Sequence, residues 1–459
     1  MGSKWKTSFL TDHYIISSGL SKPAKDFGTG YPFLSFKDIF YNYFLPDSLT
    51  QLVQSTDKER ATCSVRRGDV FLTRTSETMH ELGMSSVALK DYADATFNGF
   101  CKRLRPKESS ELEPEYVGYY LRSPIFRQGM LAFSTMSTRA SLNNEMISRL
   151  EISYPDRKTQ KKIANTLLSL DKKIALSRAI NQTLEQMSQT LFKSWFVDFD
   201  PVIDNALDVG NPIPEALQSR AELRQKVRNS ADFKPLPADI RALFPAEFEE
   251  TELGWVPQNW NIEALDSIAN FQNGLALQKF RPRNNEEQHL PVLKIADLRA
   301  GYINNDERAT VDIVDSCKVY DGDMIFSWSG TLMIDIWTGG NAALNQHLYK
   351  VTSQKYPQSF YFMWTKQHLS RFQHIAEAKA VTMGHIKKGD LSNSLCLVPS
   401  SLLVNKYDNI VEKYFTQIKN QRLLNNQLTA LRDTLLPKLI SGELSLEDLP
   451  DLVTQTEPA

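Results

Sequence analysis

The sequence is poor in the features that mark a secreted, membrane-bound or metal-binding protein. Its four cysteines are scattered and form no Cys-x-x-Cys pair, which argues against a disulfide framework or a zinc knuckle. No stretch approaches the roughly eighteen apolar residues that a membrane helix needs. The N-terminal residues contain no apolar signal-peptide region. We therefore expect a soluble protein of the reducing cytoplasm that does not associate with a membrane.

Motifs that would mark an active site are also missing. The sequence contains no P-loop and no His-Glu-x-x-His pair. Residues 27–30 (Phe-Gly-Thr-Gly) resemble a glycine loop for adenosylmethionine, but Tyr-Pro follows where a helix should begin, so a turn is favoured. Residues 211–214 (Asn-Pro-Ile-Pro) lack the aromatic residue with which an amino-methyltransferase stacks its target base. Asp171 and Lys173 mimic part of a nuclease signature, but they fall on the exposed face of a predicted helix. We predict no catalytic residue, no metal and no cofactor on this chain.

The net charge of the 459 residues is only −1, but the charge is unevenly distributed. Residues 198–252 have a net charge of −6 and residues 442–459 of −5, which leaves +10 for the rest of the chain. A positive remainder can neutralise the phosphates of a nucleic acid, while acidic segments stay off the duplex or face a partner. The charge distribution therefore permits nucleic-acid binding without proving it.

One pattern of residues occurs twice along the chain. Five local matches appear in the same order in both halves, with spacings that vary as loops of different length require. They pair Trp5 and Gly19 with Trp260 and Gly274, Asp38 with Asp297, residues 65–72 with residues 319–326, Asn98 with Asn345, and Pro155 with Pro399. Within each copy, β-branched and aromatic runs broken by Gly, Asp and Asn predict strands, with shorter helices between them. We predict two copies of one mixed α+β domain, at residues 1–155 and 253–399.

A long helix is predicted after each copy, at residues 156–197 and 400–440. Apolar residues recur at alternating spacings of four and three, which is the heptad pattern of a coiled coil. The predicted seam consists of Ile163, Leu167, Leu170, Ile174, Asn181, Leu184, Leu191, Val411, Tyr414, Ile418, Asn425, Leu428 and Leu435. Asn181 and Asn425 hold equivalent positions, where a buried Asn fixes the register; alternatively, both face solvent near a frayed end. The equal phase of the seams predicts an antiparallel coiled coil that separates the two domains.

The remaining segments are acidic. Residues 198–252 contain six prolines and predict a connector with one short helix at Glu215–Val227, ordered partly against the first long helix. Gly442 is a plausible C-cap of the second long helix. Residues 441–459 then form an acidic tail.

The boundaries of these predicted elements carry sequences that resemble those of one known family. The first long helix closes with Leu-Phe-Lys-Ser-Trp-Phe-Val-Asp-Phe-Asp-Pro-Val (residues 191–202), and the second with Thr-Leu-Leu-Pro-Lys-Leu-Ile-Ser-Gly-Glu-Leu (residues 434–444). The second domain opens with Leu-Gly-Trp-Val-Pro-Gln-Asn-Trp (residues 253–260). With the repeat and the heptads, these features resemble the DNA-specificity (S) subunit of type I restriction-modification systems over nearly the whole chain. The first domain departs from the family because only Lys4-Trp5 opens it.

This resemblance implies a subunit that recognises DNA and catalyses no reaction itself. Each domain would recognise one half of a bipartite, asymmetric site in double-stranded DNA, and the helix pair would set the gap between the halves. Two modification (methyltransferase) subunits would dock on the chain and bind adenosylmethionine, and restriction (helicase-nuclease) subunits that hydrolyse ATP would join them. The alternatives are a coiled-coil scaffold whose repeated domains bind proteins, and an enzyme, for which no motif is present.

Candidate DNA contacts lie in loops at equivalent places in the two copies. Base recognition needs hydrogen-bonding or aromatic side chains, while Lys and Arg contact phosphates and hold the register. We predict DNA contacts from Thr73, Arg74, Thr75, Ser76, Thr138 and Arg139 in the first domain, and from Ser327, Trp328, Ser329, Thr382, His385, Lys387 and Lys388 in the second. The alternative for each residue is a solvated surface loop, and for Trp328 it is packing in the core.

Overall fold

The computed structural model describes residues 5–76, 81–132, 140–284, 286–378 and 384–446. The chain forms two compact units, one of residues 1–174 and 428–459 and the other of residues 175–427. Each unit contains one mixed domain together with segments of two long helices. Among the described residues, no helix combines the length and apolar character needed to cross a membrane.

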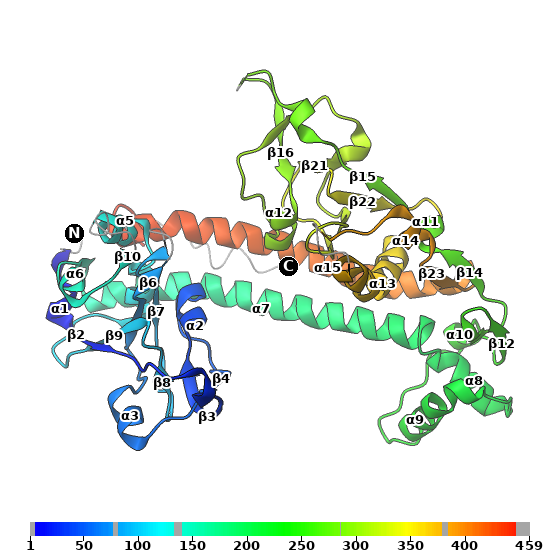
Figure 1. Cartoon of the computed structure of the whole chain (residues 1–459), viewed down its shortest axis with the longest axis horizontal. Helices are drawn as coiled ribbons and strands as arrows, with labels where there is room; N and C mark the ends of the chain where they lie inside the picture. The colour runs from blue at the N-terminus through cyan, green and yellow to red at the C-terminus, as the bar shows by residue number, and fades with distance from the viewer. Residues whose placement is uncertain (1–4, 77–80, 133–139, 285, 379–383, 447–459) are drawn as a thin grey trace. The chain divides into compact units, whose positions relative to one another are not determined.

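The first domain is built on two small sheets and two strand pairs (Figure 1, blue to cyan). The larger sheet has the order β2 (Tyr14–Ser18), β9 (Cys101–Pro106), β5 (Val70–Thr73), β7 (Ser85–Val87), and the smaller has the order β4 (Gln51–Val53), β3 (Phe27–Leu34), β8 (Thr96–Phe97). β1 (Lys6–Phe9) pairs with β11 (Glu151–Tyr154), and β6 (Thr75–Ser76) pairs with β10 (Ala140–Ser141). The helices are α1 (Leu10–His13), α2 (Phe36–Tyr41), α3 (Asp57–Thr62), α4 (Pro114–Tyr120), α5 (Pro124–Ala132) and α6 (Asn144–Ser148). The β1–β11 pair brings the start of the domain to the strand that leads into the first long helix.

The second domain repeats this arrangement. One four-stranded sheet has the order β15 (Asn270–Asn273), β22 (Leu348–Thr352), β19 (Met324–Ser327), β20 (Met333–Ile336). The other has the order β17 (Arg308–Thr310), β16 (His289–Leu293), β21 (Ala342–Leu344), β18 (Lys318–Val319), in which β18 is additional to the three strands of the corresponding sheet in the first domain. β14 (Asn261–Ala264) pairs with β23 (Leu395–Val398). The helices are α11 (Leu265–Ile268), α12 (Ile295–Ala300), α13 (Gln358–Ala378) and α14 (Lys388–Ser392). The matching strand orders confirm that the two domains are copies of one α+β fold.

An acidic residue shared by the two copies explains one of the sequence matches. The Asp38 carboxylate accepts the Ser35 backbone N–H at 2.9 Å at the start of α2. Asp297 does the same for the N–H of Lys294, at 3.0 Å, at the start of α12. Each carboxylate thus satisfies a donor that the first turn of the helix leaves free. The match of Asp38 with Asp297 therefore marks the start of a helix and does not indicate a functional acid.

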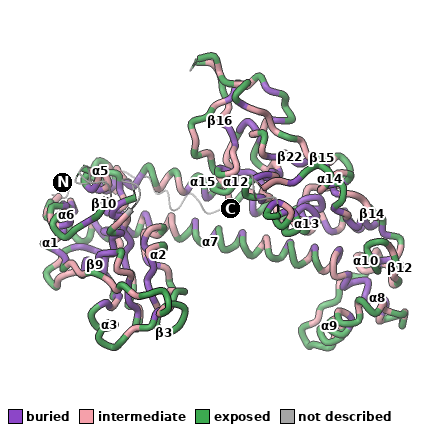
Figure 2. Tube along the Cα trace, viewed as in Figure 1, coloured by how far each residue is buried: buried purple, intermediate pink, exposed green. Residues whose placement is uncertain are grey.

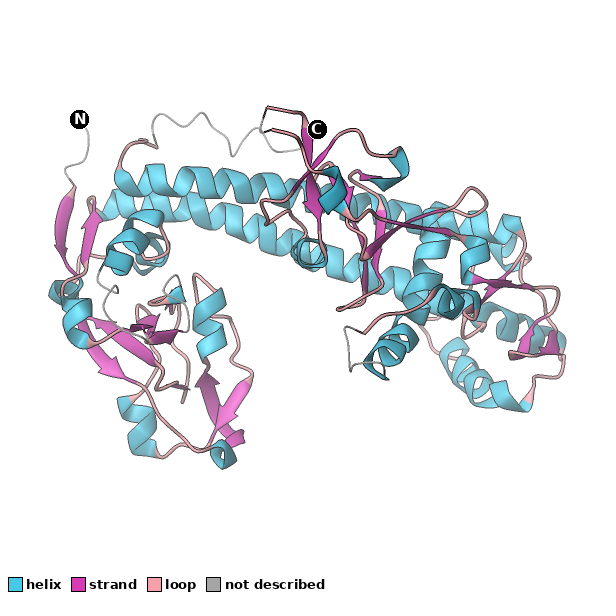
Figure 3. Cartoon of the chain, turned by 45° about the horizontal axis from the view of Figure 1, so that its top comes forward, coloured by secondary structure: helices cyan, strands magenta, loops and turns pink. Residues whose placement is uncertain are grey.

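The two long helices are α7 (Arg157–Phe196) and α15 (Ser401–Ser441), and they pack side by side (Figure 3). The seam residues predicted from the heptads are all buried or half-buried, and buried positions recur along both helices (Figure 2). In the second unit the helices run antiparallel, because Ser177 bonds Gln421 while Trp195 packs on Tyr407 with ring centroids 5.9 Å apart. The predicted antiparallel helix pair is confirmed.

Polar residues occupy two pairs of seam positions that are equivalent in α7 and α15. Asn181 and Asn425 are 6% and 8% exposed, so the alternative that they face solvent is wrong. Their side-chain oxygens have no hydrogen-bond partner among the described residues. Ser177 and Gln421 are equivalent in the repeat, and the Ser177 hydroxyl donates to the Gln421 side-chain oxygen. Equivalent residues of two antiparallel helices can meet only near a local twofold axis, so this bond marks the centre of the seam.

Asp171 was expected on a solvated face, and the structure corrects this expectation. In the first unit its carboxylate accepts the Tyr119 hydroxyl at 2.6 Å and pairs with the Arg432 guanidinium at 2.8 Å. Asp171 therefore ties α7 to both α4 and α15. Asp171 has a structural role. The rejection of a nuclease motif stands, but because these contacts hold the carboxylate and not because it is solvated.

The acidic connector is more ordered than the sequence predicted. One short helix was expected, and it is present as α9 (Gln218–Arg228), but α8 (Asp200–Val209) and α10 (Ala238–Arg241) are present as well. Proline density suggested an irregular linker, whereas Pro201 lies in the first turn of α8, where proline is tolerated because that N–H has no helical partner.

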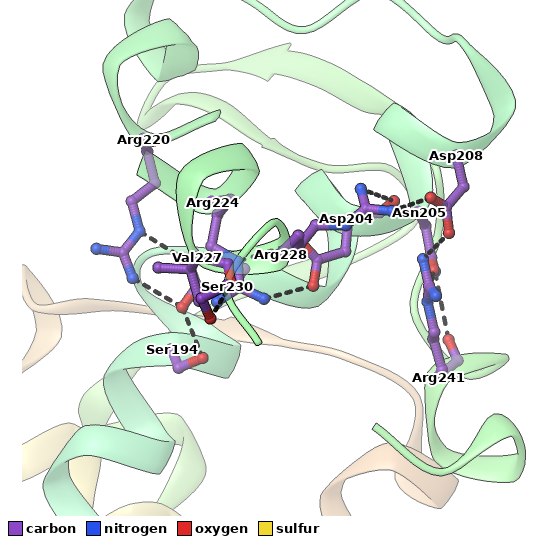
Figure 4. A network of polar contacts seen from close by, with 11 residues as sticks. Ser194, Asp204, Asn205, Asp208, Arg220, Arg224, Val227, Arg228, Ser230 and Arg241 are labelled. Atoms are coloured by element: carbon purple, nitrogen blue, oxygen red, sulfur yellow. Dashed lines mark hydrogen bonds and ion pairs between the residues drawn. The ribbon is translucent and has the colours of Figure 1, made fainter. Parts of the chain in front are cut away.

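A ladder of ion pairs joins α8 to α9 (Figure 4). Asp200, Asp204 and Asp208 pair with Arg220, Arg224 and Arg228, each pair twenty residues apart. A constant separation with a spacing of four on both helices means that α8 and α9 lie parallel and in register. The Arg220 pair is bidentate, with both contacts at 2.7 Å. The connector's acidic residues are therefore partly neutralised within the connector itself.

Candidate nucleic-acid interface

The sheet that contains β9 in the first domain and the sheet that contains β22 in the second carry an asparagine turn of the same construction. In the first domain the side-chain oxygen of Asn98 accepts the backbone N–H of Phe100 at 2.8 Å. In the second, Asn345 accepts the N–H of His347 at 3.1 Å. The backbone N–H and C=O of each asparagine also bond to equivalent groups in the two domains. The sequence match between Asn98 and Asn345 therefore marks a turn that precedes β9 or β22.

A glycine permits a neighbouring chain to approach each turn closely. A Cβ atom at Gly19 would lie 2.4 Å from the carbonyl oxygen of Asn98, and one at Gly274 would lie 2.3 Å from that of Asn345. Real Cβ atoms do not approach backbone oxygens so closely, so only glycine fits without moving the backbone. These contacts explain why the same glycine appears in both copies.

The residue that follows the central strand is held against the turn in both domains. The Arg74 N–H donates to the Phe100 carbonyl at 2.8 Å, and the Trp328 N–H donates to the His347 carbonyl at 3.4 Å. The Arg74 carbonyl accepts the Leu142 N–H at 2.7 Å, and the Trp328 carbonyl accepts the Ile386 N–H at 3.1 Å. We call these backbone bonds around Asn98 and around Asn345 the turn frame.

In the first domain the turn frame presents positive charge beside an exposed aromatic ring. Phe100 is 62% exposed. The exposed Arg74 guanidinium forms no ion pair or hydrogen bond with the residues that the structure describes. Lys102 is only 8% exposed, and its ammonium donates to the Ser18 hydroxyl at 2.9 Å. Burial, and then the charge of Arg74, lower the pKa of Lys102. Two cations that lack acidic partners in the described chain favour an incoming anion.

In the second domain the same positions carry aromatic and imidazole rings. Trp328 is half-buried, and its indole N–H donates to the Asn273 side-chain oxygen at 3.2 Å. Its ring lies 5.7 Å from Tyr349, 6.0 Å from His347 and 6.2 Å from His385, between ring centroids. Trp328 therefore packs at the edge of the core and not within it. The cluster offers ring faces and imidazole nitrogens, which suit base edges and apolar base groups.

The structure places the other predicted contact residues differently. Thr73, Ser327 and Ser329 are buried, so the expectation of exposed loop positions is wrong for them. Their hydroxyls serve the fold, because Thr73 accepts the Met84 N–H at 2.9 Å and Ser327 donates to the Ser329 carbonyl at 3.1 Å. Lys387 and Lys388 are exposed at the start of α14, and Thr75 and His385 are half-buried. Thr138, Arg139, Thr382 and the side chain of Ser76 lie outside the described residues.

Three members of the turn frame could not be picked out from the sequence. Of these three residues (Phe100, Lys102 and His347), only Phe100 is exposed. None was selected from the sequence, although the match of Asn98 with Asn345 lies two to four residues before them. A repeated asparagine followed by unlike residues is a signal of a shared turn with variable side chains. That signal becomes informative only once the backbone bonds of the turn are known to be the same in both domains.

The described residues contain no group of three or more His, Cys, Asp or Glu side chains that could hold a metal ion. The four cysteines are buried. Burial raises the pKa of the Cys101 thiol to about 12 and also raises the pKa of Cys396. These two thiols therefore stay protonated near neutral pH and are poor nucleophiles.

Two copies of one α+β domain, each leading into a long helix, with one turn frame that carries different side chains, define a two-domain recognition protein. The sequence matches the family of the type I restriction modification DNA specificity domain over residues 2–186 and 257–427. The chain belongs to this family. It is the DNA-specificity component of a type I restriction-modification system, which is a non-catalytic component, and the resemblance seen in the sequence is confirmed.

Similar proteins carry matching names. The HindI specificity subunit of Haemophilus influenzae is 25% identical over 96% of this chain and 100% of that protein. The MjaIX specificity subunit of Methanocaldococcus jannaschii is 24% identical over 97% of this chain and 94% of that protein. The fold is similar to the crystal structure of a type I restriction-modification S subunit from M. genitalium, with a TM-score of 0.52 and 13% identity over 95% of this chain and 96% of that one.

Proposed function

We propose that this chain recognises a bipartite, asymmetric sequence in double-stranded DNA, with one half-site for each domain. The observation that carries the proposal is the turn frame, which has the same backbone bonds in both domains but presents different side chains. One scaffold that holds two different sets of side chains suits two different DNA sequences. Cations in the first domain and rings in the second match the groups that contact phosphates and base edges.

Partner subunits supply the chemistry in this proposal. Two modification subunits dock on the chain, bind adenosylmethionine and methylate adenine in the two half-sites. Restriction subunits that hydrolyse ATP join them and cleave unmethylated DNA. The complex acts in the cytoplasm, and no cofactor binds to this chain. Support comes from membership in the specificity family and from the names of the relatives.

The direct test is sequencing of methylated bases in the host genome, with the gene present and deleted. We expect methylated adenine in a motif of two short blocks separated by a fixed gap, and we expect that methylation to disappear with the gene. Methylation that persists after deletion would contradict the proposal. Methyl transfer to duplex DNA by the purified chain without partners would also contradict it.

Lys387 and Lys388 are proposed as phosphate contacts of the second domain. Both are exposed, so replacing them with alanine should leave the fold intact. If each neutralises one phosphate, the slope of log affinity against log salt should become less steep by about 1.8 in the double variant. The control changes Lys226 and Lys234 of the acidic connector, which removes the same charge. Equal salt slopes for both double variants would show that α14 does not contact the duplex.

A further inference from the structure

The turn frame contains five pairs of equivalent positions at which the backbone geometry matches and the side chains differ. The pairs are Ser18 and Asn273, Arg74 and Trp328, Phe100 and His347, Lys102 and Tyr349, and Ser141 and His385. The register of the sheets supports the equivalence, since Ser18 faces Lys102 across β2 and β9 as Asn273 faces Tyr349 across β15 and β22. The asparagine at the centre is the same in both domains. The fold therefore preserves the frame and varies what it presents.

Among the five pairs, Phe100 and His347 have the side chains that packing in the core explains least. Phe100 is 62% exposed, while its N–H and C=O are both bonded, to Asn98 and Arg74. His347 has the same two backbone bonds. Its imidazole is half-buried, and the Nδ1 atom lies 3.1 Å from the Ser329 hydroxyl. A side chain that is exposed while its backbone is fixed on both sides is suited to recognition, because little geometry remains to be ordered on binding.

We infer that Phe100 and His347 are specificity-determining residues, each for the half-site that its own domain recognises. The inference rests on the proposed function, and it goes further by assigning one position of the fold to base selection in both domains. Neighbouring residues complete each set: Arg74 in the first domain and Trp328 in the second.

The two sets differ in chemistry and select different bases. Arginine pairs with the O6 and N7 acceptors of guanine, and an apolar ring favours the methyl group of thymine. Arg74 and Phe100 therefore select a guanine close to a thymine in the first half-site. His347 offers a ring nitrogen that donates or accepts. The Trp328 indole N–H is already bonded to Asn273, so Trp328 has only its half-buried ring to offer. Because Trp328 occupies the position of Arg74, the second half-site is selected without a guanidinium at that position.

The test is selection of binding sites from random duplex DNA by the full chain, expressed with the modification subunits of its own host. Wild type, Phe100→Ala, Phe100→His and His347→Ala are compared, and enriched sequences are read for each. Phe100→Ala should reduce discrimination at one or two positions of a single half-site by about five- to 150-fold, the range for one base contact. His347→Ala should do the same in the other half-site. Phe100→His should change the preferred base at the positions that Phe100→Ala relaxes.

Matched controls come from exposed aromatic residues outside the frame. Tyr41 in the first domain is 73% exposed, and Tyr302 in the second is 54% exposed. Tyr41→Ala and Tyr302→Ala should leave both half-sites unchanged. Thermal unfolding of every variant checks the fold, and exposed positions should change stability little.

The outcomes separate this inference from the proposed function. If wild type selects no bipartite motif, the proposed function fails. If wild type selects such a motif, and Phe100→Ala and His347→Ala unfold as wild type but keep both half-sites unchanged, the inference is wrong and the proposed function stands. It is also wrong if either variant relaxes both half-sites equally, because base selection would then not be divided between the domains at this position.

Discussion

The sharpest structural test of the turn frame is the substitution Gly274→Ala. The added Cβ would lie 2.3 Å from the Asn345 carbonyl oxygen and 2.4 Å from that of Leu344. Ordinary Cβ contacts are 3.4 Å or more, so both carbonyls would have to move by about 1 Å. Both obstacles are backbone atoms of the frame, and no side-chain rotation can relieve the contact.

The expected cost follows from this geometry. Overpacking costs about 1–3 kcal/mol when side chains can adjust, and the backbone contact at Gly274 favours the upper end, about 3 kcal/mol. For a unit of roughly 250 residues, each kcal/mol lowers the unfolding temperature by about 2–4 °C, so Gly274→Ala should lower it by about 6–12 °C. Recognition of one half-site should weaken because the backbone of Asn345 carries the turn.

The control is Gly389→Ala in the same domain, where a Cβ meets no atom within 4 Å. Gly389 lies in α14, and alanine favours a helix by up to about 1 kcal/mol, so this variant should be as stable as wild type or more stable. Calorimetry and binding-site selection on both variants decide the matter. A Gly274→Ala protein that melts with wild type and selects the same motif would refute the close approach at the turn.

Three further predictions concern the connector, His368 of the second domain, and the seam between the two long helices. Arg224→Ala should lower the free energy of unfolding, measured with urea, by about 3 kcal/mol, because the Asp204 carboxylate, 11% exposed, loses its bidentate partner. A loss below about 1 kcal/mol would mean that the ion pairs between α8 and α9 are solvated. Burial lowers the pKa of His368 to about 4, whereas a histidine in the unfolded chain is protonated near pH 6.5. The free energy of unfolding should therefore fall as the pH drops from 6.5 towards 4, and His368→Leu should remove that part of the pH dependence. An unchanged pH dependence in the variant would contradict the burial of His368. Asn181→Leu combined with Asn425→Leu should raise the unfolding temperature, since it removes two buried oxygens without described partners, and a lower temperature would show that both are satisfied in solution.

Periodicity and repetition predicted the architecture well because both are properties of many residues together. The heptads located the seam, and the buried Asn181 and Asn425 confirm its phase along both helices. The paired glycines and asparagines predicted a duplicated domain, and the strand orders confirm it. These signals survive because the loss of one residue does not erase the pattern.

Features set by single tertiary contacts were harder to predict. Asp171 has the sequence neighbourhood of an exposed residue, and only its contacts with Tyr119 and Arg432 reveal its role. α8 was missed because the prolines of the connector suggested a linker, while the ladder that stabilises α8 depends on arginines twenty residues away. Thr73 has the composition of a surface loop, but it is buried as the last residue of a strand. Phe100 was overlooked because an exposed phenylalanine has no periodicity to identify it.

The central claim is that two domains recognise two half-sites at a spacing set by the helix pair. It is tested most directly by binding-site selection with a chain in which one heptad is inserted into both α7 and α15. Seven residues preserve the seam and add about 10 Å at 1.5 Å per residue, which corresponds to roughly three base pairs of B-DNA. The account predicts the same two sequence blocks as wild type, with a gap longer by about three base pairs. A gap that stays constant, or a single uninterrupted block, would contradict it.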